Sequence, residues 1–170
     1  MLLIEAVFAR THISEWDLAL RLIVAVLLGG LIGWEREAKS RPAGLKTHML
    51  TALAAAVFAV VALELVHWAK INGTSADPIR AIEAVTAGVA FLAAGTIIQS
   101  RGKVTGLTTG ASMWLAGAIG VAAGTGLYSI AIYVAVLAFL ILAGLQRLSQ
   151  HINPEDVKER PSERDSSADS

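Results

Sequence analysis

Two ionisable residues lie inside long apolar runs of the sequence, where a charge is expensive. Arg21 falls in the run that begins at about Glu15, and Glu64 falls in the run that begins at about His48. A charge at the centre of a membrane helix costs about 2.5–3.5 kcal/mol on insertion scales, so such residues often serve ions or protons. At 1.5 Å per helical residue, both lie towards the outer end of their runs.

Three further charges begin the next apolar run at the same level. We therefore expect one outer polar cluster, made of Arg21, Glu64, Asp77, Arg80 and Glu83. As an ion or proton site, it predicts that Glu64→Gln abolishes activity while the protein stays in the membrane. The alternative is that these long side chains reach the interface or pair structurally.

Charges are densest in the segment between the first two runs. The candidate functional residues of this inner turn are Glu35, Arg36, Glu37, Arg41, Lys46 and His48. Arg41 before Pro42 disfavours helix, and Gly44 permits a tight turn, so we expect Arg41, Lys46 and His48 at the cytoplasmic surface. Such a patch suits a charge network or partner docking, and the alternative is plain anchoring by positive charge. Whether a metal binds stays open, because Mg²⁺ needs few protein oxygens.

Hydroxyl groups mark the start of the fourth apolar run. The candidate polar face there comprises Thr108, Thr109, Ser112 and Trp114. Thr109 and Ser112 are three residues apart and share one helix face. They either line a cavity that faces the inner turn or bond back to their own helix carbonyls.

Other chemistry finds little support in the sequence. The chain has no Cys, and we find no nucleophile elbow, zinc-protease motif or phosphate-binding loop. We expect no enzyme activity and no cofactor. The 14 Lys and Arg balance the 14 Asp and Glu, which argues against nucleic acid as a partner.

These residues must be positioned by membrane helices. Of the 170 residues, 55% are hydrophobic and only 16% are charged, against about a quarter in soluble domains. Runs of about 17–25 apolar residues can cross a bilayer. Five such runs predict an all-α bundle of five transmembrane helices, over residues 15–34, 48–68, 77–99, 106–123 and 127–148.

The two ends of the chain differ from this domain, which we place at residues 14–148. Residues 1–13 are too short to span, lack a basic start and predict an interfacial segment on the outer side rather than a signal peptide. Residues 149–170 are polar and predict a disordered cytoplasmic tail. Ten of the 14 Lys and Arg residues then lie on the inner side, so we expect the N-terminus outside and the C-terminus in the cytoplasm.

Small residues recur every fourth position on three faces. Gly29 and Gly33 form one, Gly102, Gly106 and Gly110 a second, and Ala116, Gly120 and Gly124 a third. Such faces let helix backbones approach closely. We expect packing within one bundle, while an interface in a homo-oligomer stays open.

Five motifs in order resemble the MgtC/SapB family of bacterial inner-membrane proteins. Residues 33–37 resemble its G-x-E-R-E signature, residues 41–48 its R-P-A-G-L-R-T-H/N turn, and residues 77–80 its D-P-x-R. Residues 91–95 and 104–114 resemble its F-L-G-A-G and V-R-G-L-T-T-A-A-x-x-W segments. The resemblance implies a five-span protein linked to growth in low magnesium and survival in phagocytes, with the F-type ATP synthase as a membrane partner.

The chain also departs from the family pattern. Ala90 and Ala93 stand where glycine is usual, and only residues 149–170 follow the last run where many members carry a soluble domain. We expect functions of that domain to be absent. The first hypothesis is a membrane regulator that binds another complex, and the second is a cation or proton pathway through the outer polar cluster.

Overall fold

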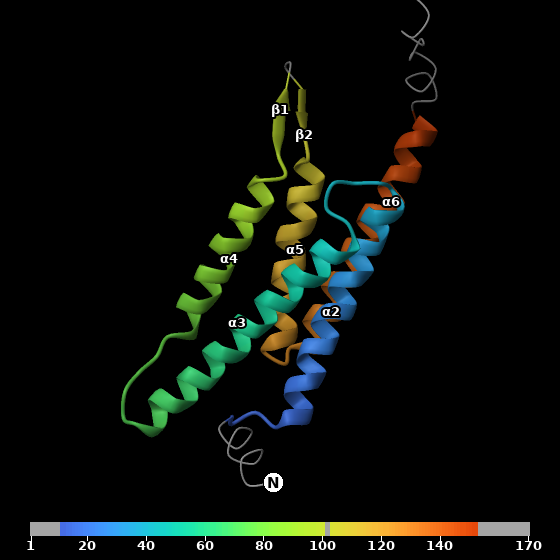
Figure 1. Cartoon of the computed structure of the whole chain (residues 1–170). Helices are drawn as coiled ribbons and strands as arrows, with labels where there is room; N and C mark the ends of the chain where they lie inside the picture. The colour runs from blue at the N-terminus through green and yellow to red at the C-terminus, as the bar shows by residue number, and fades with distance from the viewer. Residues whose placement is uncertain (1–10, 101–102, 153–170) are drawn as a thin grey trace, which may run out of the picture.

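The computed structural model describes residues 11–100 and 103–152, and within them it is a helical bundle (Figure 1). Its elements are α2 (Glu15–Ala38), α3 (Leu45–Ile71), α4 (Pro78–Ala94), β1 (Ile98–Ser100), β2 (Lys103–Thr105), α5 (Leu107–Gly124) and α6 (Tyr128–Ile152). The α2–α3 turn, the β1–β2 hairpin and the end of α6 lie at one end of the bundle, the turn end. Residue 11 and the α3–α4 and α5–α6 connections lie at the opposite end.

Polar caps set the starts of two helices where the sequence predicts them. The Ser14 hydroxyl accepts from the Asp17 amide at 3.3 Å and begins α2. The Asp77 carboxylate accepts from the Ile79 amide at 2.9 Å, and Pro78 takes the first position of α4. Each cap satisfies an amide that has no partner within its own helix.

The third predicted run is shorter as a helix than expected. We predicted it to continue to about Gln99, but α4 ends at Ala94 and the chain forms a hairpin in which Ile98 pairs with Thr105. Gly95 and the β-branched residues after it favour a helix end and a strand. Gly106 then has φ of 87°, and a Cβ there would overlap the Thr96 carbonyl, so only glycine fits before α5.

Small residues bring α5 into close contact with its neighbours. A Cβ added to Gly124 would lie 2.8 Å from the Cα of Ala56 on α3, and one added to Gly117 would lie 2.9 Å from Val89 on α4. A Cβ on Gly29 of α2 would similarly lie 2.7 Å from Ala52. The predicted packing of these faces within one bundle is confirmed for the third face and for Gly29 and Gly33, while Gly102 lies outside the described residues.

Within the part of the chain that the structure describes, three helices are long and apolar enough to cross a membrane, namely α2, α3 and α5. The 17-residue α4 is at the lower limit for a span, and α6 is apolar from Tyr128 to Gly144. α6 continues to Ile152, beyond the predicted domain end at residue 148. Large apolar side chains on the outside of the bundle are exposed, including Leu27, Phe58 and Phe91, as expected for contact with lipid.

Ser40 follows α2 with φ of 50°, a left-handed conformation that favours glycine. We expect Ser40→Gly to raise the free energy of unfolding by about 0.5–1 kcal/mol, because glycine adopts this φ without the Cβ penalty. Denaturant unfolding of the purified protein in detergent measures the change. Ser75→Gly is the control, since Ser75 has no positive φ and should lose stability; a gain there and none at Ser40 would contradict the explanation.

Candidate functional site

Charged and polar side chains are buried at the turn end of the bundle. Glu35 is 6% exposed, Arg36 3% and His48 0%. On α5, Thr109 and Ser112 are also buried. We call these five residues, together with Lys39, the turn-end cluster.

Glu35 lies in a set of ion pairs formed within α2. Its carboxylate pairs closely with the Lys39 ammonium one turn later, and the Arg36 Nη1 lies 3.6 Å from its Oε2. The Lys39 ammonium also donates to the Leu142 carbonyl at 3.0 Å, which connects α2 to α6. Even so, neither Glu35 oxygen receives a hydrogen bond within the described residues, so the carboxylate is compensated by ion pairing.

Glu37 instead holds the turn itself. Its Oε2 accepts from the Leu45 amide at 2.8 Å, so it caps the first turn of α3 across the loop. A Cβ on Gly44 would overlap this carboxylate oxygen. A side chain at Gly44 would therefore displace the Glu37 carboxylate and disturb its bond to the Leu45 amide.

His48 joins α3 to α5. Its Nδ1 lies 2.8 Å from the Gly44 carbonyl, which can only accept, so Nδ1 carries the proton and donates. Its Nε2 lies 3.0 Å from the Ser112 Oγ, which also lies 2.9 Å from the Thr109 carbonyl. With His48 neutral, Nε2 and the Thr109 carbonyl are both acceptors that compete for the one hydroxyl proton of Ser112.

The predicted surface patch at the inner turn is therefore wrong in part. Arg41 and Lys46 are exposed as expected, but His48 is fully buried. The reason is that α3 begins at Leu45, which places His48 in its first turn and on the face towards α5. On the predicted polar face of α5, Thr108 and Trp114 are exposed while Thr109 and Ser112 are buried. Ser112 both approaches its own helix carbonyl and contacts the segment of the inner turn.

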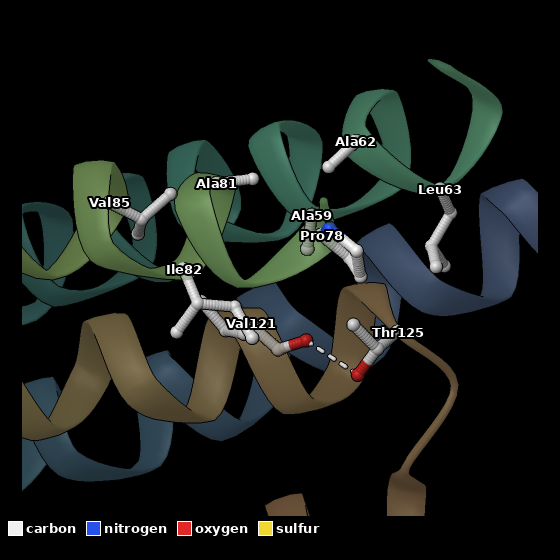
Figure 2. A pocket seen from close by; sticks show the side chains of 9 residues that line it. All are labelled: Ala59, Ala62, Leu63, Pro78, Ala81, Ile82, Val85, Val121 and Thr125. Carbon is white, nitrogen blue, oxygen red and sulfur yellow. Dashed lines mark hydrogen bonds between the residues drawn. The ribbon is translucent and has the colours of Figure 1, made fainter. Parts of the chain in front are cut away.

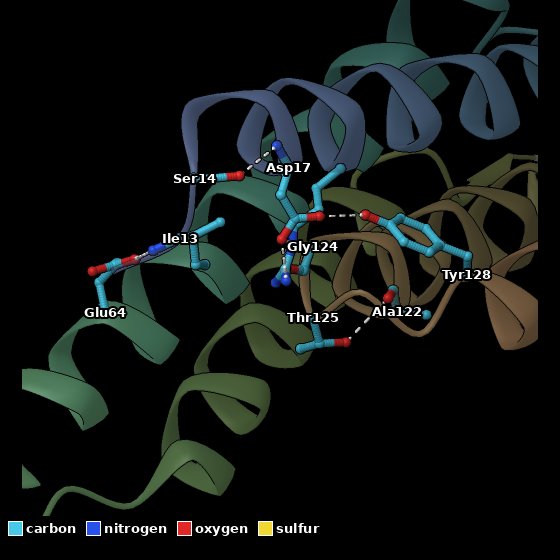
Figure 3. Close-up of polar contacts among 9 residues, drawn as sticks. Ile13, Ser14, Asp17, Glu64, Ala122, Gly124, Thr125 and Tyr128 are labelled. Carbon is cyan, nitrogen blue, oxygen red and sulfur yellow. Dashed lines mark hydrogen bonds and ion pairs between the residues drawn. The ribbon is translucent and has the colours of Figure 1, made fainter. Parts of the chain in front are cut away.

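A second polar group lies at the opposite end (Figure 3). Arg21 pairs with Asp17 at 2.6 Å and donates to the Gly124 carbonyl at 2.9 Å. The Tyr128 hydroxyl donates to the other Asp17 oxygen at 3.0 Å. These contacts tie α2 to the end of α5 and the start of α6.

Glu64 has a different role at that end. Its carboxylate accepts from the backbone amides of His12 and Ile13 at 2.8 and 2.9 Å, and so holds the segment before α2 against α3. The imidazole of His67, one turn later, stacks on that of His12 with centroids 3.7 Å apart. Ile13 and Glu64 are seen together in Figure 3. An open cleft of about 580 Å³ adjoins these side chains.

The five residues expected in one outer polar cluster are thus separated. Within the described residues, no hydrogen bond or ion pair joins any two of them. Asp77 caps α4, and Arg80 and Glu83 are exposed. Arg21 bonds to the end of α5, whereas Glu64 bonds to the segment before α2.

Removing the Arg21 side chain is expected to loosen this end. Arg21→Met leaves the Asp17 Oδ2 and the buried Gly124 carbonyl without the guanidinium donor, so the free energy of unfolding should fall by about 2 kcal/mol. Denaturant unfolding in detergent measures the change. Arg80→Met removes an exposed charge and should change stability by less than about 0.5 kcal/mol; an equal loss in both variants would contradict the structural role.

Several residues of these groups are not evident from sequence motifs. Asp17, Lys39 and Tyr128 are examples, and helix spacing gives a signal for the first two. Lys39 is four residues after Glu35 and Arg21 four after Asp17, the spacing of ion pairs on one helix face. Tyr128 carries no such signal, because its partner lies far away in the sequence.

The cavities are mainly apolar. A groove of about 510 Å³ lies between α3 and α4, and a cavity of about 150 Å³ lies between α4 and α5 beside Trp114. Where α3, α4 and α5 meet, a cavity of about 30 Å³ has room for one water (Figure 2). Among residues 11–100 and 103–152, no three His, Asp or Glu side chains converge as metal ligands.

Comparison with known sequences decides the family. The model described as the MgtC family matches residues 22–151, which include the turn-end cluster and most of the bundle. The chain belongs to the MgtC family. It is therefore a membrane protein, in agreement with its apolar helices and with the resemblance found in its motifs.

Individual relatives cover most of this chain. It is 36% identical to Protein SrpB of Synechococcus elongatus, over 81% of this chain and 80% of SrpB. It is 34% identical to the putative magnesium transporter YhiD of Escherichia coli, over 78% and 62% of the two chains. It is 40% identical to Protein MgtC of Brucella abortus, over 74% of this chain and 50% of that relative. The chain thus spans half to two thirds of the latter two relatives, and no solved structure gives a significant match.

Proposed function

We propose that this MgtC-family chain is a non-enzymatic regulator of the bacterial inner membrane that acts through a membrane partner and is linked to magnesium. All five helices of the described chain cross the membrane, with the N-terminus outside and the turn end in the cytoplasm. The excess of Lys and Arg at the turn end supports this orientation. The magnesium link is supported by the relatives, one of which is named a putative magnesium transporter.

The groove between α3 and α4 is the observation that best supports a regulator that binds a membrane partner. Its volume is about 510 Å³, and it is lined almost entirely by apolar side chains, with small residues such as Ala54, Ala84 and Gly88 along its walls. A Cβ added to Gly88 would meet nothing within 4 Å. Small residues on a membrane helix allow another helix to approach closely, so this flank suits an apolar helix of a partner.

The polar groups of the bundle fit this proposal. His48 and Ser112 bond to each other, and Arg21, Asp17 and Tyr128 bond to one another and to backbone. The first contact fixes α3, one wall of the groove, against α5, and the others fix α2 against α5 and α6. By family resemblance, the F-type ATP synthase is the first partner to test.

Filling the groove tests the proposal. Gly88→Leu should reduce recovery of the membrane partner with affinity-tagged protein by about tenfold, the effect of losing about 1.4 kcal/mol of binding. Gly144→Leu is the matched control, because Gly144 on α6 also has open space around it and should leave recovery unchanged. Equal recovery with both variants, each with normal expression and thermal stability, would contradict the groove as the partner site. Strains that carry Gly88→Leu or Gly144→Leu should likewise differ in their growth in low magnesium.

A cation or proton pathway is the second candidate, and one observation favours it. Glu35 is buried at 6% exposure within a helix long enough to span, and buried ionisable groups in membrane helices often lie on such pathways. This candidate predicts flux across a bilayer that requires the Glu35 carboxylate.

A further inference from the structure

The Glu35 carboxylate is a buried charge that ion pairs surround and that no hydrogen-bond donor reaches within the described residues. Its side chain is 4% exposed, yet no hydrogen bond reaches Oε1 or Oε2 within the described residues. A buried carboxylate without hydrogen-bond donors is costly unless a cation compensates it. The compensation here comes mainly from the Lys39 ammonium.

The ammonium of Lys39 lies between two oxygen ligands. One is the Glu35 carboxylate on α2, and the other is the Leu142 carbonyl on α6, at 3.0 Å from Nζ. Carboxylate and backbone carbonyl oxygens are also the donors that hard inorganic cations take from proteins. The ammonium therefore stands where such a cation would bind.

We propose that Glu35 and the Leu142 carbonyl form a cation site at the turn end, which Lys39 fills in this structure and which a hard inorganic cation fills when Lys39 leaves. The Lys39 side chain is 31% exposed, so it can withdraw into water along the side from which it enters. A cation entering there keeps water ligands on that open side, as Mg²⁺ commonly does.

Two features determine how the site behaves. The Arg36 guanidinium lies 3.6 Å from Glu35, so it competes for the same negative charge and weakens binding of the cation. Withdrawal of Lys39 also removes its bond to Leu142, which is one of the contacts that hold α6 to α2. Exchange of Lys39 for a cation thus changes a contact between helices.

The inference goes beyond both candidate functions, because a local cation site needs neither a partner nor a path across the membrane. It can therefore fail while the partner proposal holds, and the reverse is also true. Its test uses the thermal stability of the protein in detergent, which depends on neither flux nor partner binding.

Emptying the site tests the proposal. Lys39→Met removes the ammonium but keeps an apolar stem of similar length. Its Tm should rise with the logarithm of the MgCl₂, NaCl or KCl concentration above the dissociation constant, by about 4 °C at ten times that constant. Separate titrations with these three salts at constant ionic strength, held with choline chloride, show which cation the site prefers. The Tm of the wild-type protein should show no such rise over the same range, because Lys39 competes.

Two variants serve as controls. Lys46→Met removes an exposed lysine of the same turn, and its Tm should show no such rise. Glu35→Gln combined with Lys39→Met removes the carboxylate charge and should fold without any response to cation. A Tm of Lys39→Met that does not respond to any of the three cations, or the same response in the double variant, would overturn the site. So would failure of Lys39→Met to fold in every salt while the double variant folds.

Discussion

Replacing Gly120 with alanine is expected to lower the free energy of unfolding by about 3 kcal/mol. A Cβ at this position would overlap the Ala52 carbonyl and lie 2.8 Å from the Cβ of Ala55 on α3. The contact is largely with backbone, so α5 and α3 would have to separate, and overpacking of this kind costs about 1–3 kcal/mol or more. Denaturant unfolding in detergent gives the value directly.

Gly144→Ala provides the comparison for that result. It makes the same change in α6, where an added Cβ meets nothing within 4 Å, so the gain in helix propensity should raise stability by up to about 1 kcal/mol. The two variants should therefore shift in opposite directions. Similar shifts in both would mean that close packing of α5 on α3 does not hold the bundle together.

Loss of the His48 side chain is expected to have a comparable effect. His48→Ala leaves a cavity at a fully buried position and removes the contact with Ser112, for an expected loss of about 3 kcal/mol. Ser112→Ala leaves the buried Nε2 without its partner and should cost about 1–2 kcal/mol. Both values come from unfolding curves of the purified variants.

The double variant, with both His48→Ala and Ser112→Ala, isolates the energy of the contact between these two side chains. If His48 and Ser112 bond as the structure has them, the double variant should lose less unfolding free energy than the two single variants lose together. The difference should be about 1 kcal/mol. Thr108→Ala, on the exposed side of the same helix turn, should change stability by less than about 0.5 kcal/mol. Strict additivity would show that the two side chains do not interact.

Much of the helical framework could be predicted from the sequence, because it depends on local properties. Apolar runs and caps such as Ser14 and Asp77 locate helices without reference to distant residues. The end of α4 was predicted too late, because hydropathy does not distinguish an apolar helix from the strand that begins at Ile98.

The candidate site was harder to predict, because it depends on which way each helix faces. The level of Glu64 and Arg80 along the bundle follows from counting residues, but their separation depends on helix rotation. His48 was placed at the surface because its helix was expected to begin later. Contacts such as Asp17 with Tyr128 join residues far apart in sequence and leave no local pattern.

The two polar groups appear at opposite ends of the bundle, and each connects α2 to other helices. Arg21 and Asp17 connect it to α5 and α6, and Lys39 connects it to α6 at the turn end. Between these ends, the packing is mainly of small apolar residues, such as Ala25, Ala56 and Ala123. This arrangement favours a rigid bundle that presents the groove between α3 and α4, which is the basis of the proposed regulator.

Cation and proton flux in proteoliposomes tests this account most directly. With the purified protein reconstituted alone, we expect no flux of Mg²⁺, Na⁺, K⁺ or H⁺ above that of empty vesicles. Glu35→Gln and Glu64→Gln, with Gly144→Ala as a folded control, should then be indistinguishable from the wild type. Flux by the wild type that disappears in either glutamine variant and persists in Gly144→Ala would contradict the regulator and establish a pathway through that carboxylate.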